Sequence, residues 1–332
     1  ARRLDSWRRA LTSPIRSVAP NPDGLVRCAR IPAVLPDQAR HWLLDVFGDG
    51  SRILQVRRFV LGGWHVNHAV NVRDRCGDVH RVVLRRWARP GWELDDPDYT
   101  VAREVRVLGL LGSTEIPAPS VIASDLDGAR CDVPAVLLTR LPGHPPTSTD
   151  SASVGFCHQL AETLAAIHDL DPGAEPWLDP YRLYYERADA VLPGWIPVTP
   201  IWRRAIASVR QPPPAQTVMA LIHRDYHPEN TLWSRRRLTG VVDWTQASSG
   251  PPGLDVGHMR WNLVLDHGQT VADTFLASYW AATGRPTGDQ GYWDLVSLFD
   301  LLLDVDDGPG DITPDDLRLL ESHAAAALTS LG

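Results

Sequence analysis

Apolar residues recur with two different periods along the chain, and the change falls near residue 150. In the first part, runs rich in β-branched and aromatic residues predict strands at 51–60, 64–72, 79–87, 120–124 and 135–141. Apolar residues at helical spacing predict a helix at 36–47, which Gly48 ends, and a second helix at 97–111. The first part is therefore expected to be a sheet accompanied by helices.

Helical periodicity dominates the second part of the chain. It predicts helices at 151–170, 179–191, 200–210, 254–266, 271–283, 289–304 and 314–329. Two short apolar strands are predicted at 218–222 and 238–243. The segment Pro-Gly-His-Pro-Pro at 142–146 separates the strand-rich part from the helix-rich part. The sequence therefore predicts an α+β fold with an N-terminal sheet domain at 1–141 and a mostly helical domain at 142–332.

Composition narrows the classes of partner. The 332 residues carry a net charge of −7, which argues against a nucleic-acid binder. No apolar run approaches the roughly eighteen residues of a membrane span. The arginine-rich start has no hydrophobic segment behind it, so we expect no secretory signal. Four cysteines without a CxxC pair favour reduced thiols, and we expect a cytoplasmic monomer or homodimer with neither nucleic acid nor membrane as partner.

One block of residues carries the chemistry. Residues 223–230 read His-Arg-Asp-Tyr-His-Pro-Glu-Asn, and Asp243 ends the following apolar strand. Asp225 is placed to accept the proton of an attacking hydroxyl, while Asn230 and Asp243 offer the hard oxygen ligands that Mg²⁺ prefers. We expect both acids at the ends of neighbouring strands, where they share one metal–triphosphate assembly. The spacing predicts ATP-dependent phosphoryl transfer.

A zinc hydrolase is the alternative for the same block. His223 and His227 bracket the acid as His-x-Asp-x-His, a pattern that zinc sites also use. No third histidine or cysteine with ligand spacing lies nearby in the sequence, and oxygen donors such as Asn230 and Asp243 favour magnesium. We therefore expect His223 to be a packed, hydrogen-bonded residue that shapes the loop.

These motifs resemble those of the aminoglycoside phosphotransferase and choline kinase-like superfamily of small-molecule kinases. The family's loop reads His-Gly-Asp-x-His-x-x-Asn, and its metal-binding strand reads Ile-Asp-Phe/Trp, here Val242-Asp-Trp244. The family's Gly-Asp-Pro-x-x-Asp-Leu-Ala segment corresponds to 250–257, and its Leu-Ala-x-Leu-His helix end to 164–168. The resemblance extends from about residue 55 to 265. Two departures stand out, because Arg224 replaces a glycine and Pro251 replaces an aspartate.

The resemblance implies a bilobal protein-kinase-like fold in which residues 1–141 bind the nucleotide and residues 142–332 carry the catalytic loop and substrate pocket. It implies ATP or GTP as phosphoryl donor, Mg²⁺ as cofactor and a small-molecule hydroxyl compound as acceptor. Asp225 then corresponds to the catalytic aspartate and Asn230 and Asp243 to the magnesium ligands. Asp255 corresponds to a structural acid at the start of a helix.

The chain contains no lysine, and all 33 of its basic residues are arginine. Kinases use a lysine on the third strand to hold nucleotide phosphates, and the resemblance places Arg85 at that position with Glu104 as its ion-pair partner. An exposed strand arginine is the other interpretation of Arg85. The phosphate-covering turn corresponds to 61–67 with Gly62, Gly63 and Asn67, and the adenine-binding hinge includes Thr139, Arg140 and Leu141.

The residues beyond the loop argue against a protein kinase. Asp243 is followed by Trp-Thr rather than Phe-Gly, and only 89 residues remain after it. About eighty residues separate the hinge from Asp225, which is where small-molecule kinases build an acceptor pocket. The acceptor is therefore expected to be a small molecule.

The sequence leaves the identity of that acceptor open. A late group of acids would suit a polycationic antibiotic such as an aminoglycoside, and it is equally consistent with a solvated acidic surface: Asp300, Asp304, Asp306, Asp307 and Asp311. An antibiotic-like acceptor such as an aminoglycoside or macrolide is the first hypothesis, and a metabolite such as choline, homoserine or a sugar is the second. A catalytically weak nucleotide-binding protein is the third, because arginine replaces the usual lysine.

Overall fold

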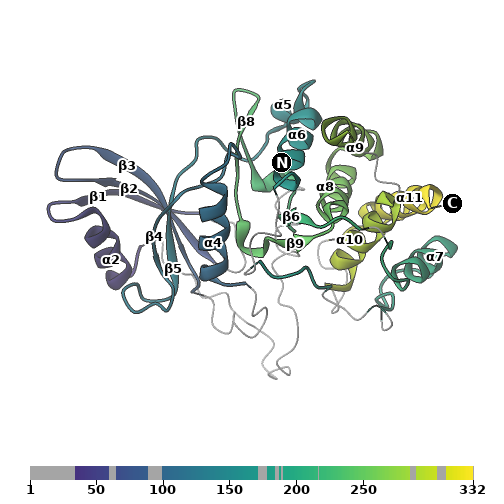
Figure 1. Ribbon diagram of the computed structural model, residues 1–332, viewed down its shortest axis with the longest axis horizontal. Coiled ribbons are helices and arrows are strands. Elements are labelled where there is room, and N and C mark those ends of the chain that lie inside the picture. Colours follow the sequence, from purple (N-terminus) through teal and green to yellow (C-terminus); the bar gives the residue numbers. More distant parts are fainter. Residues whose placement is uncertain are drawn as a thin grey trace. The chain divides into compact units, whose positions relative to one another are not determined.

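The computed structural model describes most of the chain beyond residue 33 (Figure 1). The described residues are 34–59, 65–88, 99–170, 178–183, 187, 190–215, 217–284, 289–304 and 312–331. Contacts between Cα atoms divide the chain into two compact units. Unit 1 comprises residues 1–114 and 118–141, and unit 2 comprises residues 115–117 and 142–332.

Unit 1 is built on a five-stranded antiparallel sheet with the order β1-β2-β3-β5-β4. Its strands are β1 (Arg52–Arg58), β2 (Val66–Arg73), β3 (Val79–Arg86), β4 (Val121–Asp125) and β5 (Ala135–Thr139). The predicted strands in this part of the chain are confirmed, and no end differs by more than two residues from its predicted position. Hairpin pairing of β1, β2 and β3 follows their order in the sequence.

Helix α2 (Asp37–Phe47) covers one face of this sheet. Trp42 and Leu43 of the helix are buried in one cluster with Val70 of β2 and Leu84 of β3. Gly48 ends the helix at a φ of 82°, a backbone angle that favours glycine over any other residue. The predicted helix is therefore confirmed together with its stop signal.

Helix α4 (Val101–Leu111) lies on the opposite face of the sheet (Figure 1). Side chains of a strand alternate between faces, so Leu84 packs toward α2 while its neighbour Arg85 reaches Glu104 of α4. The helix begins at residue 101 rather than 97, because the Thr100 side chain accepts a hydrogen bond from the Arg103 amide and caps it there.

Unit 2 is mostly helical, as predicted. Its helices are α5 (Ser148–Ser151), α6 (Phe156–His168), α7 (Pro200–Val209), α8 (Pro252–His267), α9 (Gln269–Thr283), α10 (Gln290–Asp304) and α11 (Pro314–Ser330). Helix α8 approaches α10 closely through two glycines, because a Cβ atom on Gly253 or Gly257 would lie 2.4 Å or 2.8 Å from atoms of Trp293. Among the described residues, no helix has the length and apolar character needed to cross a membrane.

Two short antiparallel sheets complete unit 2. Strand β6 (Ala220–Ile222) pairs with β9 (Ser248–Gly250), and β7 (Thr231–Ser234) pairs with β8 (Arg237–Val241). Asp225 follows β6 and Asp243 follows β8, so the two acids do not end neighbouring strands of one sheet, and that expectation is wrong. The pairing of β6 with β9 joins segments about thirty residues apart, which local sequence patterns do not encode.

Two predicted helices of unit 2 also need correction. The helix predicted at 151–170 is the shorter α6, which begins at Phe156. Residue 151 instead ends the separate short helix α5, which Thr147 and Asp150 start with a capping box. The segment predicted as helical at 179–191 is not helical over 179–183, where the Tyr181 amide donates instead to the Ser249 carbonyl (2.8 Å). A hydrogen bond to a distant residue, Ser249, thus replaces the local hydrogen bond that a helix would give the Tyr181 amide.

Candidate functional site

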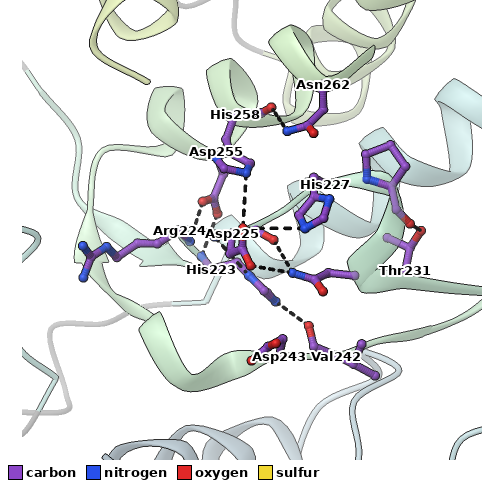
Figure 2. Close-up of polar contacts among 12 residues, drawn as sticks. His223, Arg224, Asp225, His227, Thr231, Val242, Asp243, Asp255, His258 and Asn262 are labelled. Carbon is purple, nitrogen blue, oxygen red and sulfur yellow. Dashed lines mark hydrogen bonds and ion pairs between the residues drawn. The ribbon is translucent and has the colours of Figure 1, made fainter. Parts of the chain in front are cut away.

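The loop that carries Asp225 is fixed by a buried carboxylate of helix α8 (Figure 2). Asp255 is fully buried, and its two oxygens accept hydrogen bonds from the backbone amides of His223 and Arg224, both at 2.7 Å. His168 Nε2 of α6 donates to the same carboxylate at 3.1 Å, and its Nδ1 lies 2.7 Å from the Tyr279 hydroxyl. The acid at the start of α8 therefore holds the catalytic loop through its backbone.

His223 joins this loop to the strand that leads to Asp243. Its Nε2 donates to the Val242 carbonyl (3.0 Å), so its Nδ1 is left to accept the Asp225 amide (3.3 Å). These two bonds require the neutral Nε2–H tautomer, and burial correspondingly lowers the pKa of His223 against the neighbouring carboxylates. His223 is thus a packed, hydrogen-bonded residue, as its place in the sequence suggested.

Three side chains surround the Asp225 carboxylate. Asn230 Nδ2 donates to its Oδ2 (2.8 Å) and to its backbone carbonyl (2.9 Å). The imidazoles of His227 and His258 face its Oδ1, with Nε2 atoms at 3.6 Å and 3.3 Å (Figure 2). The Asp225 side chain remains 32% exposed, while those of His227 and His258 are 11% and 16% exposed. The carboxylate is therefore held on its inner side and open to solvent on the other.

This environment keeps Asp225 ionised. Burial by itself raises the pKa of a carboxyl group, but the attraction of His227 and the contact with His258 outweigh that effect. The pKa of Asp225 consequently lies well below its ordinary value. An ionised, partly exposed carboxylate can accept a proton from a hydroxyl group that approaches its open side.

Asn230 and Asp243 are tied to each other through the backbone. The Val242 amide donates to the Asn230 carbonyl (2.9 Å), which places Asp243 one residue away from that link. Asp243 adopts the left-handed conformation (φ 69°), and its Oδ1 accepts a hydrogen bond from the Thr245 hydroxyl (3.0 Å). Non-glycine residues are uncommon at this backbone angle, and they cluster at functional sites.

The donor chemistry of these two side chains fits magnesium. Both amide hydrogens of Asn230 point at Asp225, so its amide oxygen is the atom left to coordinate a cation. Asp243 adds a carboxylate, and Mg²⁺ commonly takes one or two protein ligands together with water and phosphate oxygens. Over the described part of the chain, no group of three or more His, Cys, Asp or Glu side chains is placed to hold a metal.

Arg224 occupies a position where the family's motif has glycine, and its positive φ explains why glycine suits this position. Its φ is 70°, in the region that costs other residues about 1–2 kcal/mol. Its guanidinium carbon lies 5.2 Å from the ring centre of Tyr181, which in turn donates to Asp300 Oδ2 of α10 (2.8 Å). The arginine keeps the loop's conformation at the expense of some stability.

In unit 1, Arg85 and Glu104 form a buried ion pair. Arg85 Nη1 donates to Glu104 Oε1 (2.7 Å), and the two side chains are only 7% and 1% exposed. Arg85 Nε also donates to Asn67 Oδ1 of β2 (3.2 Å). Arg85 is therefore not an exposed strand arginine, and three residues expected at the nucleotide are brought together. Their contact with a nucleotide stays a prediction.

The remaining nucleotide-binding predictions concern backbone groups of the hinge and the glycine turn. The Thr139 amide donates to the Ser120 carbonyl (2.9 Å) and the Arg140 amide to the Arg81 carbonyl (3.1 Å), so both donors are engaged within unit 1. The adenine contact predicted for Thr139, Arg140 and Leu141 must therefore use other groups of this segment. Gly62 and Gly63 lie outside the described residues.

His258 is the site residue that the sequence analysis did not identify. It lies three residues after Asp255 in α8, a spacing that puts both side chains on one face of the helix. That spacing was a usable signal once Asp255 was assigned to the loop. Of the late acidic residues, Asp300 accepts a hydrogen bond from Tyr181, whose ring also contacts the loop residue Arg224. Asp306, Asp307 and Asp311 lie outside the described residues.

Known proteins resemble the chain in sequence and in structure. The sequence matches the model of the phosphotransferase enzyme family over residues 58–290. A homoserine kinase of Rhodospirillum rubrum is 30% identical over an alignment of 154 residues, which covers 41% of this chain and 46% of that protein. The match therefore spans less than half of this curated relative, and the same holds for a homoserine kinase of Granulibacter bethesdensis (27% identical over 153 residues).

The structural similarities extend over more of the chain. The apoenzyme of macrolide 2'-phosphotransferase MphH from Brachybacterium faecium has a TM-score of 0.56 at 20% identity, covering 87% of this chain and 97% of its own. A ternary complex of aminoglycoside phosphotransferase APH(4)-Ia with AMP-PNP and hygromycin B has a TM-score of 0.59 at 18% identity, with the same coverage. At these identities the likeness establishes the fold, which is that of protein-kinase-like phosphotransferases.

Proposed function

The chain belongs to the phosphotransferase enzyme family, and from this premise we propose that it is a small-molecule kinase. It transfers the terminal phosphoryl group of ATP, or of GTP, to a hydroxyl group of its acceptor. The observation that carries the proposal is the arrangement of Asp225 and Asn230, in which one amide fixes the carboxylate and presents its own oxygen for a metal. Phosphoryl transfer needs this combination of a positioned base and a metal ligand.

The residues divide the chemical work between them. Asp225 orients the acceptor hydroxyl and takes its proton as the oxygen bonds to phosphorus. Asn230 and Asp243 hold Mg²⁺, which when bound neutralises charge on the transferring phosphate. Arg85, fixed by Glu104, binds phosphate oxygens of the donor with a planar guanidinium in place of a lysine ammonium. The buried ion pair argues against a degenerate, inactive site.

An antibiotic-like acceptor is the first candidate. Among the structures with this fold is one with bound hygromycin B and AMP-PNP, and another is a macrolide 2'-phosphotransferase. Asp300 of α10, which accepts the Tyr181 hydroxyl, supplies a negative charge that suits a cationic, hydroxyl-rich compound.

A small metabolite is the second candidate. The observation that favours it is sequence similarity to two homoserine kinases, which exceeds the identity to the structures above. Homoserine carries a primary hydroxyl group on a compact zwitterion with one ammonium and one carboxylate group. The two candidates thus differ in acceptor size while sharing the same chemistry at Asp225.

An acceptor screen tests the proposal and separates these candidates. Purified protein with Mg²⁺ and ATP or GTP is incubated with aminoglycosides, macrolides, homoserine, choline and simple sugars, and phosphorylated products are detected by mass spectrometry. A product that increases in mass by one phosphoryl group, and that needs both nucleotide and Mg²⁺, supports the proposal. Failure to bind either nucleotide in a calorimetric titration with Mg²⁺ would contradict it.

A further inference from the structure

His258 has a buried ring nitrogen that faces the carboxylate of Asp225. Its Nε2 is shielded from solvent and makes no well-formed hydrogen bond, and it lies 3.3 Å from Asp225 Oδ1. The ring packs edge-on against Trp261, with centroids 4.8 Å apart, and lies 5.7 Å from the ring of His227. The imidazole is therefore held in place by aromatic packing and aimed at the carboxylate (Figure 2).

The two oxygens of Asp225 are restrained from different elements. Asn230 fixes Oδ2 from within the catalytic loop. His227 of the same loop lies 3.6 Å from Oδ1, too far for a hydrogen bond, so the loop alone leaves the carboxylate able to turn about its last bond. His258 approaches Oδ1 from α8, the helix that Asp255 anchors to the same loop. A contact at each oxygen fixes the plane of the carboxylate, and with it the direction from which a hydroxyl group must approach.

We propose that His258 is a positioning residue for Asp225: its Nε2–H donates to Oδ1 and sets the carboxylate for the acceptor hydroxyl. This role rests on the proposed function of Asp225. The bond is long without ligands, as catalytic hydrogen bonds often are, and it shortens when the acceptor hydroxyl binds. His258 lies outside residues 223–230, and it therefore extends the site onto a helix face of α8.

Substitutions at position 258 separate positioning from structural support. His258→Gln places an amide Nε2–H near the original nitrogen, His258→Ala removes the donor, and His258→Glu puts a second carboxylate against Asp225. His158→Ala is the matched control, because His158 is also helical but its side chain is 63% exposed. The assay measures kcat and KM for Mg-ATP hydrolysis, with water as acceptor, together with the Tm and the ADP affinity.

We expect kcat to fall at least about tenfold in His258→Ala, with KM for ATP and ADP affinity within twofold and Tm within a few degrees of wild type. His258→Glu should lose more rate, because its carboxylate repels that of Asp225. His258→Gln should recover most of the rate. The proposal is overturned if His258→Ala keeps the wild-type kcat while Asp225→Asn loses it. It is also overturned if the Gln and Ala variants lose rate equally together with Tm, which indicates a structural role. An unchanged rate in Asp225→Asn would instead refute the function proposed for the site.

Discussion

Replacing Asp255 with asparagine tests whether one buried carboxylate holds the catalytic loop. Its oxygens accept the amides of His223 and Arg224 and the ring of His168. An asparagine has the same shape but offers one acceptor oxygen, so in either orientation its NH₂ group faces a backbone or imidazole donor. Hydrogen bonds to charged groups contribute about 1.5–3 kcal/mol each, and we expect a loss of about 2–3 kcal/mol.

The expected loss corresponds to a lower Tm by about 4–12 °C for a unit of this size. Differential scanning calorimetry measures it, and hydrogen exchange reports whether the amides at 223 and 224 become exposed more often. Asp315→Asn is the matched control, because Asp315 is 60% exposed and contacts Arg318 on the surface. Its effect should stay below about 1 kcal/mol.

The same variant has a pH signature. Contacts with His168 and the loop amides overcome the effect of burial and hold the pKa of Asp255 below its ordinary value of 3.8. A carboxyl group with a lowered folded-state pKa stabilises the fold fully above the unfolded value and loses that contribution as pH falls through the folded value. The Tm difference between wild type and Asp255→Asn should therefore narrow as pH drops below 3.8. Equal Tm and equal exchange at neutral pH would refute the anchoring role.

Three further predictions follow from the contacts around the site. Arg85→Ala should weaken ATP binding, measured by calorimetry, and destabilise the fold by about 3–5 kcal/mol, because the buried Glu104 carboxylate loses its ion pair with Arg85. Unchanged affinity and Tm would contradict the ion pair's role. The free energy of unfolding in urea should be about 1 kcal/mol higher for Arg224→Gly than for Arg224→Ala, because both variants lose the arginine side chain but only glycine relieves the strain of the positive φ. Equal stabilities would show that residue 224 is not strained. Asp243→Asn should shift the Mg²⁺ dependence of ATP hydrolysis to higher concentrations, and EDTA should abolish hydrolysis in the wild type; an unshifted Mg²⁺ curve would remove Asp243 from the metal site.

Local sequence patterns were sufficient for most of the fold. The strands of unit 1 and the helices from α7 onward follow from β-branched and aromatic runs and from helical periodicity, which are local signals. The pairing of Arg85 with Glu104 was predictable by combining strand alternation with the resemblance to kinases. The stop at Gly48 was predictable because glycine takes up the positive φ that ends the helix.

Contacts between distant segments account for what the sequence did not reveal. The register of β6 against β9 depends on partners about thirty residues apart, and the irregular backbone at Tyr181 depends on Ser249. The contact of His258 with Asp225 exists only once α8 is docked on the loop through Asp255. The motif that carries the resemblance ends at Gly257, so His258 was marked only by its spacing of three residues from Asp255.

The most direct test of the account is the rate of phosphoryl transfer by Asp225→Asn. The wild type and the variant are compared at saturating Mg-ATP, with the acceptor identified by the screen or with water, and ADP binding is measured in parallel by calorimetry. A positioned general base contributes about 10²–10⁴-fold, so we predict a loss of kcat in that range with an unchanged ADP affinity. A variant that binds ADP normally and turns over at the wild-type rate would contradict Asp225 as the catalytic base.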